Sequence, residues 1–118
     1  MQLEQKVEEQ LTNFLTGKGY DIRVQPLLST IDIIATKGKN IILFEVKSKE
    51  RIDASDIANL KSEEEKTRKE LKANVKSFLY SQGTITGSAQ ELSRQFNIGI
   101  LKPEELGCFY SNPIFNKK

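Results

Sequence analysis

Three charged residues interrupt two apolar runs in the first half of the chain. Asp32 lies within the run from Ile31 to Ala35, and Glu45 and Lys47 lie at the end of the run from Ile41 to Val46. Burying a charge is costly unless the charge is paired or bound to a metal. A conflict of this kind between an apolar run and its charges is expected at a functional site.

The spacing of these three residues predicts that they meet. Side chains alternate along a strand, so Glu45 and Lys47 share one face while Val46 points to the other. Asp32, on the partner strand, would approach Glu45 from the side. Two carboxylates suit Mg²⁺ or Mn²⁺, and a neighbouring lysine can orient a water or stabilise developing negative charge. The alternative is an ion pair between Lys47 and an acid on an exposed strand face.

A β-hairpin is the element that would position these groups. The segment Lys37–Asn40 is a polar turn that contains glycine, and it joins the two apolar runs. The alternating segment from Gly19 to Val24 predicts another strand just before the hairpin.

In the sequence, one helix is predicted before these strands and another after them. From Gln2 to Thr16 the apolar residues recur at helical spacing, and a glycine-rich segment ends the helix. The next helix is predicted to begin after the N-cap Asp53 and to end with Leu71 and Val75. It has no apolar residue between Lys61 and Glu70, so its middle is expected to be exposed, or to face a partner or DNA.

The last third of the chain alternates strand and helix. The segment Ser77–Ser81 predicts a buried strand. The segment Ser88–Glu91 is the capping box of a predicted helix that Asn97 closes, and Ile98–Leu101 predicts a last strand. Pro103 to Leu106 suits one helical turn. The fold class is α/β, in the order α-β-β-β-α-β-α-β. Because a strand–helix–strand unit is parallel and a hairpin antiparallel, the central sheet is expected to be mixed and flanked by helices.

The composition fits a single domain over residues 1–118 and excludes several chemistries. The chain has no histidine, so it has neither a Ser-His-Asp triad nor histidine metal ligands. Its one cysteine, Cys108, excludes an intramolecular disulfide and a cysteine-based metal site. Catalysis would therefore need carboxylates, lysines, hydroxyls or a metal held by oxygen. No membrane span or signal-peptide pattern is present, so a cytoplasmic location is expected.

Local charge favours a nucleic-acid partner more than net charge does. The formal net charge is only +2, but between Lys37 and Arg51 five basic residues stand against two acids. This basic cluster is expected to surround the metal site, because lysines and arginines supply most phosphate contacts. The alternative is an ordinary basic turn and loop. The candidate DNA-binding residues are Lys37, Lys39, Lys49 and Arg51.

Asp32 followed by Glu45-Val46-Lys47 resembles the motif of the PD-(D/E)xK nuclease superfamily, which has the restriction-endonuclease-like fold. The segments Asp32–Gly38 and Phe44–Ser48 are similar to those of archaeal Holliday-junction resolvases in particular. Ile31 stands where the motif's name has proline. The resemblance covers roughly Val7 to Leu101, is strongest from Asp32 to Ser48 and is weak after Arg51.

The resemblance also implies a glutamate on the first helix, about three turns before the glycine that closes the helix. Glu8 stands eleven positions before Gly19 and fits this place best, and Glu4 is the other candidate. For either residue the alternative is a solvated flank of an amphipathic helix.

The family implies a Mg²⁺- or Mn²⁺-dependent DNA endonuclease that hydrolyses phosphodiester bonds in branched or duplex DNA. Its most specific form is a structure-selective enzyme of the Holliday-junction resolvase type. Asp32, Glu45 and the Val46 carbonyl would hold the metal, Glu8 would add an outer or second-metal contact, and Lys47 would position the water. Cutting two strands implies a homodimer. Its contact is expected at the polar helix or at the apolar tail from Gly107 to Lys118.

Two alternatives remain open from the sequence. One is a non-catalytic DNA-binding or regulatory module with the same fold. The other is a nuclease subunit that works only within a larger restriction or repair complex.

Overall fold

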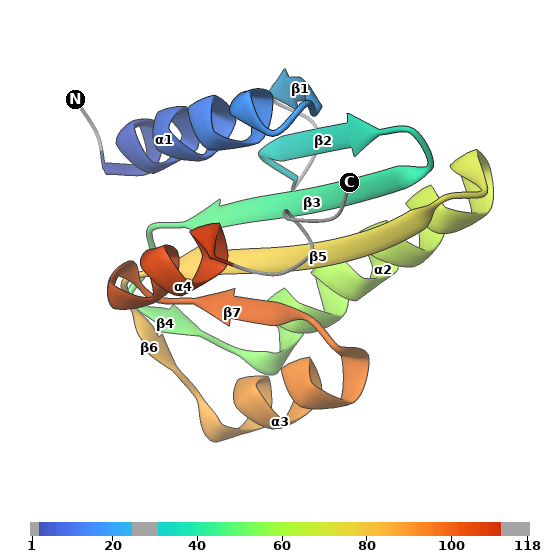
Figure 1. The fold of residues 1–118 in the computed structure, drawn as a ribbon. Coiled ribbons are helices and arrows are strands. Elements are labelled where there is room, and N and C mark those ends of the chain that lie inside the picture. Colours follow the sequence, from blue (N-terminus) through green and yellow to red (C-terminus); the bar gives the residue numbers. More distant parts are fainter. Residues whose placement is uncertain (1–2, 25–30, 112–118) are drawn as a thin grey trace.

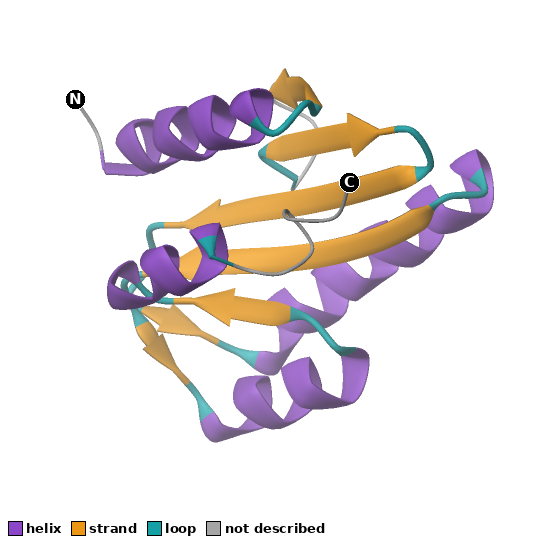
Figure 2. Ribbon diagram, in the orientation of Figure 1, coloured by secondary structure: helices purple, strands orange, loops and turns teal. Residues whose placement is uncertain are grey.

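The computed structural model describes residues 3–24 and 31–111 (Figure 1 and Figure 2). The described elements, in chain order, are α1 (Leu3–Gly17), β1 (Asp21–Val24), β2 (Ile33–Lys37), β3 (Asn40–Lys47), β4 (Arg51–Ile52), α2 (Ala54–Leu71), β5 (Asn74–Ser81), β6 (Thr84–Ile85), α3 (Gly87–Phe96), β7 (Gly99–Leu101), the 3₁₀ turn η1 (Pro103–Glu105) and α4 (Leu106–Tyr110). The predicted order is confirmed, and β4 and β6 are added to it. Within this part of the chain no helix is long and apolar enough to cross a membrane.

The central sheet is mixed, as predicted. Its strand order is β1-β2-β3-β5-β7, and β4 pairs with β6 in a separate two-stranded sheet. The pairs β1–β2 and β2–β3 are antiparallel, while β3–β5 and β5–β7 are parallel. The carboxyl ends of β3, β5 and β7 therefore meet at one edge of the sheet, where ligands bind in many open α/β sheets.

Helices cover both faces of this sheet, and each face has its own apolar cluster (Figure 1). α1 and α4 pack on the face that carries Phe44 and Phe78. α2 and α3 pack on the other face, which carries Leu43 and Leu79. Alternation along β3 therefore places Glu45 on the α2 side of the sheet, because Glu45 has the same parity as Leu43.

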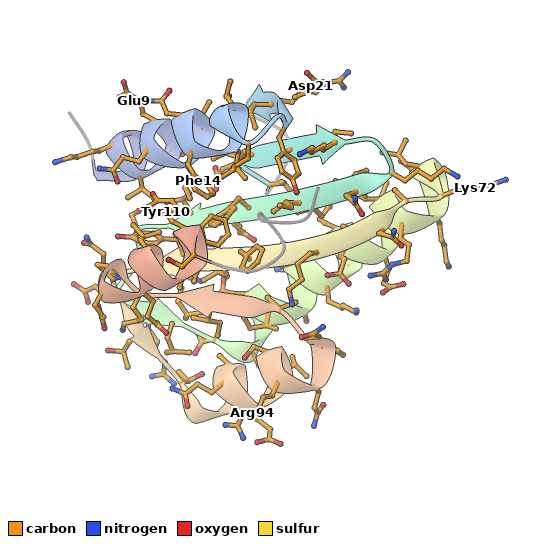
Figure 3. All side chains as sticks on the ribbon, viewed as in Figure 1. Glu9, Phe14, Asp21, Lys72, Arg94 and Tyr110 are labelled. Carbon is orange, nitrogen blue, oxygen red and sulfur yellow. The ribbon has the colours of Figure 1, made fainter. Side chains whose placement is uncertain are left out.

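Two aromatic residues of the tail, Phe109 and Tyr110, belong to the domain's own core. Phe109 of α4 is buried and makes edge-on contacts with Phe44 and Phe78, with ring centroids 5.1 and 5.0 Å apart. Phe14 of α1 and Tyr110 point towards one another (Figure 3), with centroids 4.5 Å apart. Residues 112–118, the rest of the predicted contact surface, lie outside the described part of the chain.

Two predicted helix boundaries are wrong for local reasons. Val75 does not end α2, because Lys72 adopts a left-handed conformation that stops the helix, and Val75 pairs with Ile41 in the sheet. The cap of α3 is Thr86 rather than a box beginning at Ser88, because the Thr86 hydroxyl accepts a hydrogen bond from the Ala89 N–H at 3.2 Å. By contrast, α2 begins directly after Asp53, as predicted.

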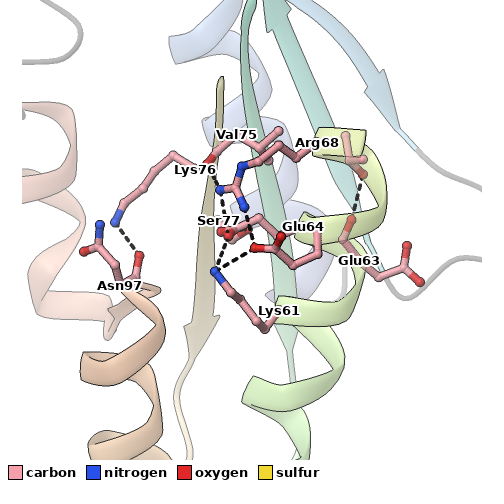
Figure 4. Close-up of polar contacts among 10 residues, drawn as sticks. Lys61, Glu63, Glu64, Arg68, Val75, Lys76, Ser77 and Asn97 are labelled. Carbon is pink, nitrogen blue, oxygen red and sulfur yellow. Dashed lines mark hydrogen bonds and ion pairs between the residues drawn. The ribbon is translucent and has the colours of Figure 1, made fainter. Parts of the chain in front are cut away.

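The polar middle of α2 is not simply exposed, which corrects the sequence prediction. Glu64 is only 2% exposed and faces Ser77 of β5, whose hydroxyl donates a hydrogen bond to Glu64 at 2.8 Å. Lys61 and Arg68 contact the same carboxylate at 2.7 and 3.0 Å (Figure 4). Paired polar groups therefore replace an apolar stripe at this contact between helix and sheet.

Candidate functional site

Four charged side chains converge at the carboxyl end of β3. Glu45 and Lys47 come from β3 itself, Asp32 directly precedes β2, and Asp56 lies in the first turn of α2. The charges of Lys47, Asp32 and Asp56 all influence the pKa of Glu45. The predicted meeting of Asp32, Glu45 and Lys47 is confirmed, whereas their chemical roles stay predictions.

Asp32 is fixed in place by the backbone of the neighbouring strand. Its N–H donates to the Phe44 carbonyl at 2.9 Å, and its carboxylate oxygen Oδ2 accepts from the Val46 N–H at 2.6 Å. Both bonds connect Asp32 to the residues on either side of Glu45. The hairpin pairing thus holds the Asp32 carboxylate beside the Glu45 position.

Glu45 is buried next to the lysine on its own face. Its side chain is 3% exposed, and Lys47 Nζ lies 2.8 Å from Glu45 Oε1. Burial raises the pKa of Glu45; the hydrogen bond and charge of Lys47 oppose this rise, and the charges of Asp32 and Asp56 add to it. Burial alone would lower the pKa of Lys47, but the hydrogen bond and charge of Glu45, together with Asp56 and Asp32, raise it. Lys47 is therefore held in its charged form.

Asp56 is a member of the site that the sequence prediction did not include. It is only 5% exposed, and its Oδ1 lies 2.6 Å from Lys49 Nζ and 3.9 Å from Lys47 Nζ. Its Oδ2 accepts a hydrogen bond from the Asp53 N–H at 2.8 Å. Burial would raise the pKa of Asp56, but the Lys49 and Asp53 hydrogen bonds and the two lysine charges outweigh burial and lower it.

The sequence offered one signal for Asp56, its place three residues after the helix cap Asp53. By itself, that spacing indicates only a helix cap. The Asp53 bond uses one carboxylate oxygen and leaves the other to face the two lysines. The link to Lys47 depends on how α2 packs on β3, which spacing along the chain does not give.

Glu8 lies half-buried on α1, the helix on the opposite face of the sheet from Glu45. Its role as a third acid of the site stays a prediction. Glu4 is also in α1, but its side chain lies outside the described part of the chain.

The basic cluster divides between the two ends of β3, so the expectation that all of it surrounds the site is wrong. Lys37 ends β2 and Lys39 lies in the hairpin turn, and seven residue steps, about 23 Å at 3.3 Å per residue, separate the start of β3 from Lys47. Lys37 Nζ donates to the Lys18 carbonyl at 2.8 Å. Of the candidate DNA-binding residues, only Lys49 and Arg51 follow β3 at the site end.

The donor set at this site fits a divalent cation. Glu45 Oε2 is buried and has no hydrogen-bond partner among the described residues, so it is an acceptor that lacks a donor. The Asp32 carboxylate lies close enough to influence it. Within the described ranges no three acidic, histidine or cysteine side chains form a metal-holding group. Mg²⁺ is commonly bound by one or two carboxylates and several waters.

Comparisons with known proteins are informative only at the level of structure. No protein-family model matches the sequence, and no curated protein sequence is significantly similar to it. A repair endonuclease from Pyrococcus abyssi has a similar structure, with a TM-score of 0.63 and 18% identity over 84% of this chain and 45% of that one. EndoMS in its apo form gives a TM-score of 0.63 and 20% identity over 87% and 48% of the two chains. The chain has the restriction-endonuclease-like fold.

A complex of EndoMS with double-stranded DNA has the same restriction-endonuclease-like fold, with a TM-score of 0.59 and 20% identity over 82% of this chain and 43% of that one. The chain thus spans less than half the length of these three neighbours. At such identities the likeness shows a shared fold. The fold expected from the resemblance at Asp32, Glu45 and Lys47 is confirmed.

Proposed function

We propose that this domain is a metal-dependent DNA endonuclease that hydrolyses phosphodiester bonds. The observation that carries the proposal is the buried Glu45 carboxylate, which has one oxygen on Lys47 and the other without a hydrogen-bond partner among the described residues. The restriction-endonuclease-like fold of repair endonucleases supports it.

The side chains have distinct roles in this proposal. Asp32 and Glu45, with the Val46 carbonyl, would hold Mg²⁺ or Mn²⁺, and Glu8 would contribute from α1. When bound, the metal would activate a water and polarise the phosphoryl oxygens. Hydrolysis adds water to the phosphorus and breaks one of its bonds to a sugar oxygen.

Lys47 supplies a fixed positive charge to this reaction. Its ammonium is held between Glu45 at 2.8 Å and Asp56 at 3.9 Å, and this pairing raises its pKa. A lysine that stays charged can donate to the attacking water or to an oxygen on which negative charge develops. Asp56 acts through Lys47 and Lys49 and is thus a positioning residue.

The substrate in this proposal is branched DNA, as in Holliday-junction resolvases. Lys49 and Arg51 lie at the site end of β3, paired with Asp56 at 2.6 Å and with Asp53 at 3.0 Å, and both side chains are exposed to solvent. In this proposal they add phosphate contacts, which position DNA without reading its sequence. Cutting two strands of a symmetric junction would need two copies of the site, so the proposal includes a homodimer.

Incubation of the purified chain with four-way junction, duplex, flap and single-stranded DNA, with Mg²⁺ or with a chelator, tests the proposal. We expect strand cleavage that requires the metal and is fastest on the junction. Cleavage that is fastest on another DNA form would overturn the junction preference alone. Tight DNA binding without cleavage of any form would favour the non-catalytic module.

A further inference from the structure

A pocket separate from the candidate site lies beside β7, at the edge of the sheet where the parallel strands end. It has a volume of about 610 Å³ and is formed by β6, α3, β7 and η1. Two basic side chains line it, Arg94 and Lys102, together with the uncharged polar side chains of Thr84, Gln90 and Ser93. No part of the proposed catalytic chemistry uses this pocket.

The backbone connects this pocket to the candidate site. Gly83 packs so closely on the segment after β3 that a methyl group in its place would overlap the carbonyl oxygens of Lys49 and Glu50. Lys102 Nζ donates to the Gly83 carbonyl at 2.7 Å. Thr84, which lines the pocket, donates its N–H to the Glu50 carbonyl at 2.8 Å. These contacts therefore fix the position of the segment around Lys49 relative to the pocket.

The pocket and the candidate site lie at the same end of the parallel strands. β7 is two strands away from β3 in the sheet, which is about 10 Å at the usual strand spacing. Phosphates of one DNA strand that follows this edge of the sheet can therefore contact both places.

Arg94 supplies an unused positive charge in this pocket. It lies in the last turn of α3, is exposed, and has no ion pair among the described residues (Figure 3). The one acid in the lining, Glu105, accepts a hydrogen bond from the Lys102 N–H at 3.0 Å. A guanidinium is suited to bidentate contact with a phosphate. Ile85 and Ile100 add apolar surface that a sugar can cover.

We propose that this pocket binds a backbone phosphate of the DNA strand that enters the candidate active site. The inference rests on the proposed action on DNA and extends the DNA contact from Lys49 to Arg94. The ligand class is the phosphodiester, and Arg94 and Lys102 are its positive partners.

The test compares Arg94→Gln with Lys69→Gln, which also removes one exposed positive charge. Lys69 lies near the end of α2, at the opposite edge of the sheet, where β5 begins. Affinity for one junction and one duplex is measured over a range of salt concentrations in chelator, so that no strand is cut. We expect Arg94→Gln to weaken binding several-fold and to reduce the salt slope by about one, while Lys69→Gln leaves both close to wild type.

Wild-type affinity and salt slope in Arg94→Gln would overturn the inference, as would equal losses in both variants. Inorganic phosphate is titrated in parallel. If it binds in an Arg94-dependent way while DNA affinity does not change, the pocket is a free-anion site and the inference is wrong. Since binding is measured without metal, loss of the proposed nuclease activity alone would not change these outcomes.

Discussion

At the scale of single residues, the central feature is a lysine shared by two buried acids. Lys47 contacts Glu45 at 2.8 Å and Asp56 at 3.9 Å, and Asp56 also holds Lys49 at 2.6 Å. If a metal takes part of the Glu45 carboxylate, Asp56 still faces the ammonium of Lys47. The two lysines therefore have different expected roles, because Lys47 is nearer to Glu45 and Lys49 is more exposed.

Lys47→Ala should separate catalysis from DNA binding. We expect cleavage to fall by about 10²–10³, the usual cost of losing one preorganised electrostatic contact. Affinity for DNA should change little, with a salt slope lower by about one, because other basic groups remain. Cleavage rate at saturating DNA and affinity at fixed salt are measured together.

Lys49→Ala is the matched control for this variant, because Lys49 is the other lysine that contacts Asp56. It should weaken DNA binding and leave the rate at saturating DNA closer to wild type. If Lys47→Ala instead loses affinity and keeps its cleavage rate per bound complex, Lys47 is a DNA-binding residue and the non-catalytic module is the better interpretation.

Asp56→Asn should change how stability depends on pH. The pKa of Asp56 is lowered in the folded state, so its contribution is present above its ordinary pKa of about 3.9 and is lost as pH falls through the lower folded value. We expect the variant to lose about 1–2 kcal/mol of unfolding free energy at neutral pH, with the difference shrinking in acid. Urea unfolding at pH 7 and at pH 2.5 measures this, and an equal loss at both values would contradict it.

At the scale of elements, the sequence predicted the strands better than the ends of the helices. The β2–β3 hairpin follows from two apolar runs joined by a glycine-containing turn, and the shared face of Glu45 and Lys47 follows from alternation along a strand. Both are local properties of the sequence. The place of Val75 depends on its pairing with Ile41, a contact between distant segments. Asp56 was missed for the same reason, since its link to Lys47 exists only once α2 packs on β3.

The contact between α2 and β5 shows how a polar helix can still be buried on one side. Glu64 is enclosed by Lys61, Arg68 and Ser77. Arg68 Nη2 also lies 3.3 Å from the Val75 carbonyl of β5 (Figure 4). The hydrophobic pattern predicts that this stretch is exposed, because the pattern depends on apolar residues and does not detect paired charges.

Glu64→Gln should therefore destabilise the fold more than the polar sequence around Glu64 suggests. The change removes the buried carboxylate that Lys61 and Arg68 share, although both basic side chains keep the partly exposed Glu65 carboxylate. Because both are also partly solvated, we expect a loss of about 1–3 kcal/mol in unfolding free energy. Denaturant unfolding measures it. Glu70→Gln, at an exposed position of the same helix, is the control and should lie within about 0.5 kcal/mol of wild type. Equal effects of the two variants would contradict the role of the network.

At the scale of the whole molecule, the mixed sheet with helices on both faces was predictable, because the element order restricts the topology. The β4–β6 pair was not, since two-residue strands carry no periodic signal. The position of Lys37 and Lys39 far from the site was also missed. Closeness along the chain does not give closeness in space here, because the eight-residue strand β3 separates these lysines from the site.

A homodimer remains a proposal at this scale. Sedimentation at micromolar concentration, with and without junction DNA, should detect a two-chain species. Because Phe109 is already buried in the domain's own core, the surface of the polar helix α2 and the tail beyond Ser111 are the places to alter. A monomer both free and bound to DNA would contradict the proposal.

The most direct test of the central claim is the Mg²⁺ dependence of DNA cleavage in Glu45→Gln beside Glu9→Gln. Glu9 is an exposed acid on α1 and serves as the matched control (Figure 3). Removing the Glu45 charge takes away a proposed metal ligand and relieves repulsion with Asp32 and Asp56, so the variant should stay folded. We expect no metal-dependent cleavage by Glu45→Gln and wild-type cleavage by Glu9→Gln. A near wild-type rate in folded Glu45→Gln would contradict it.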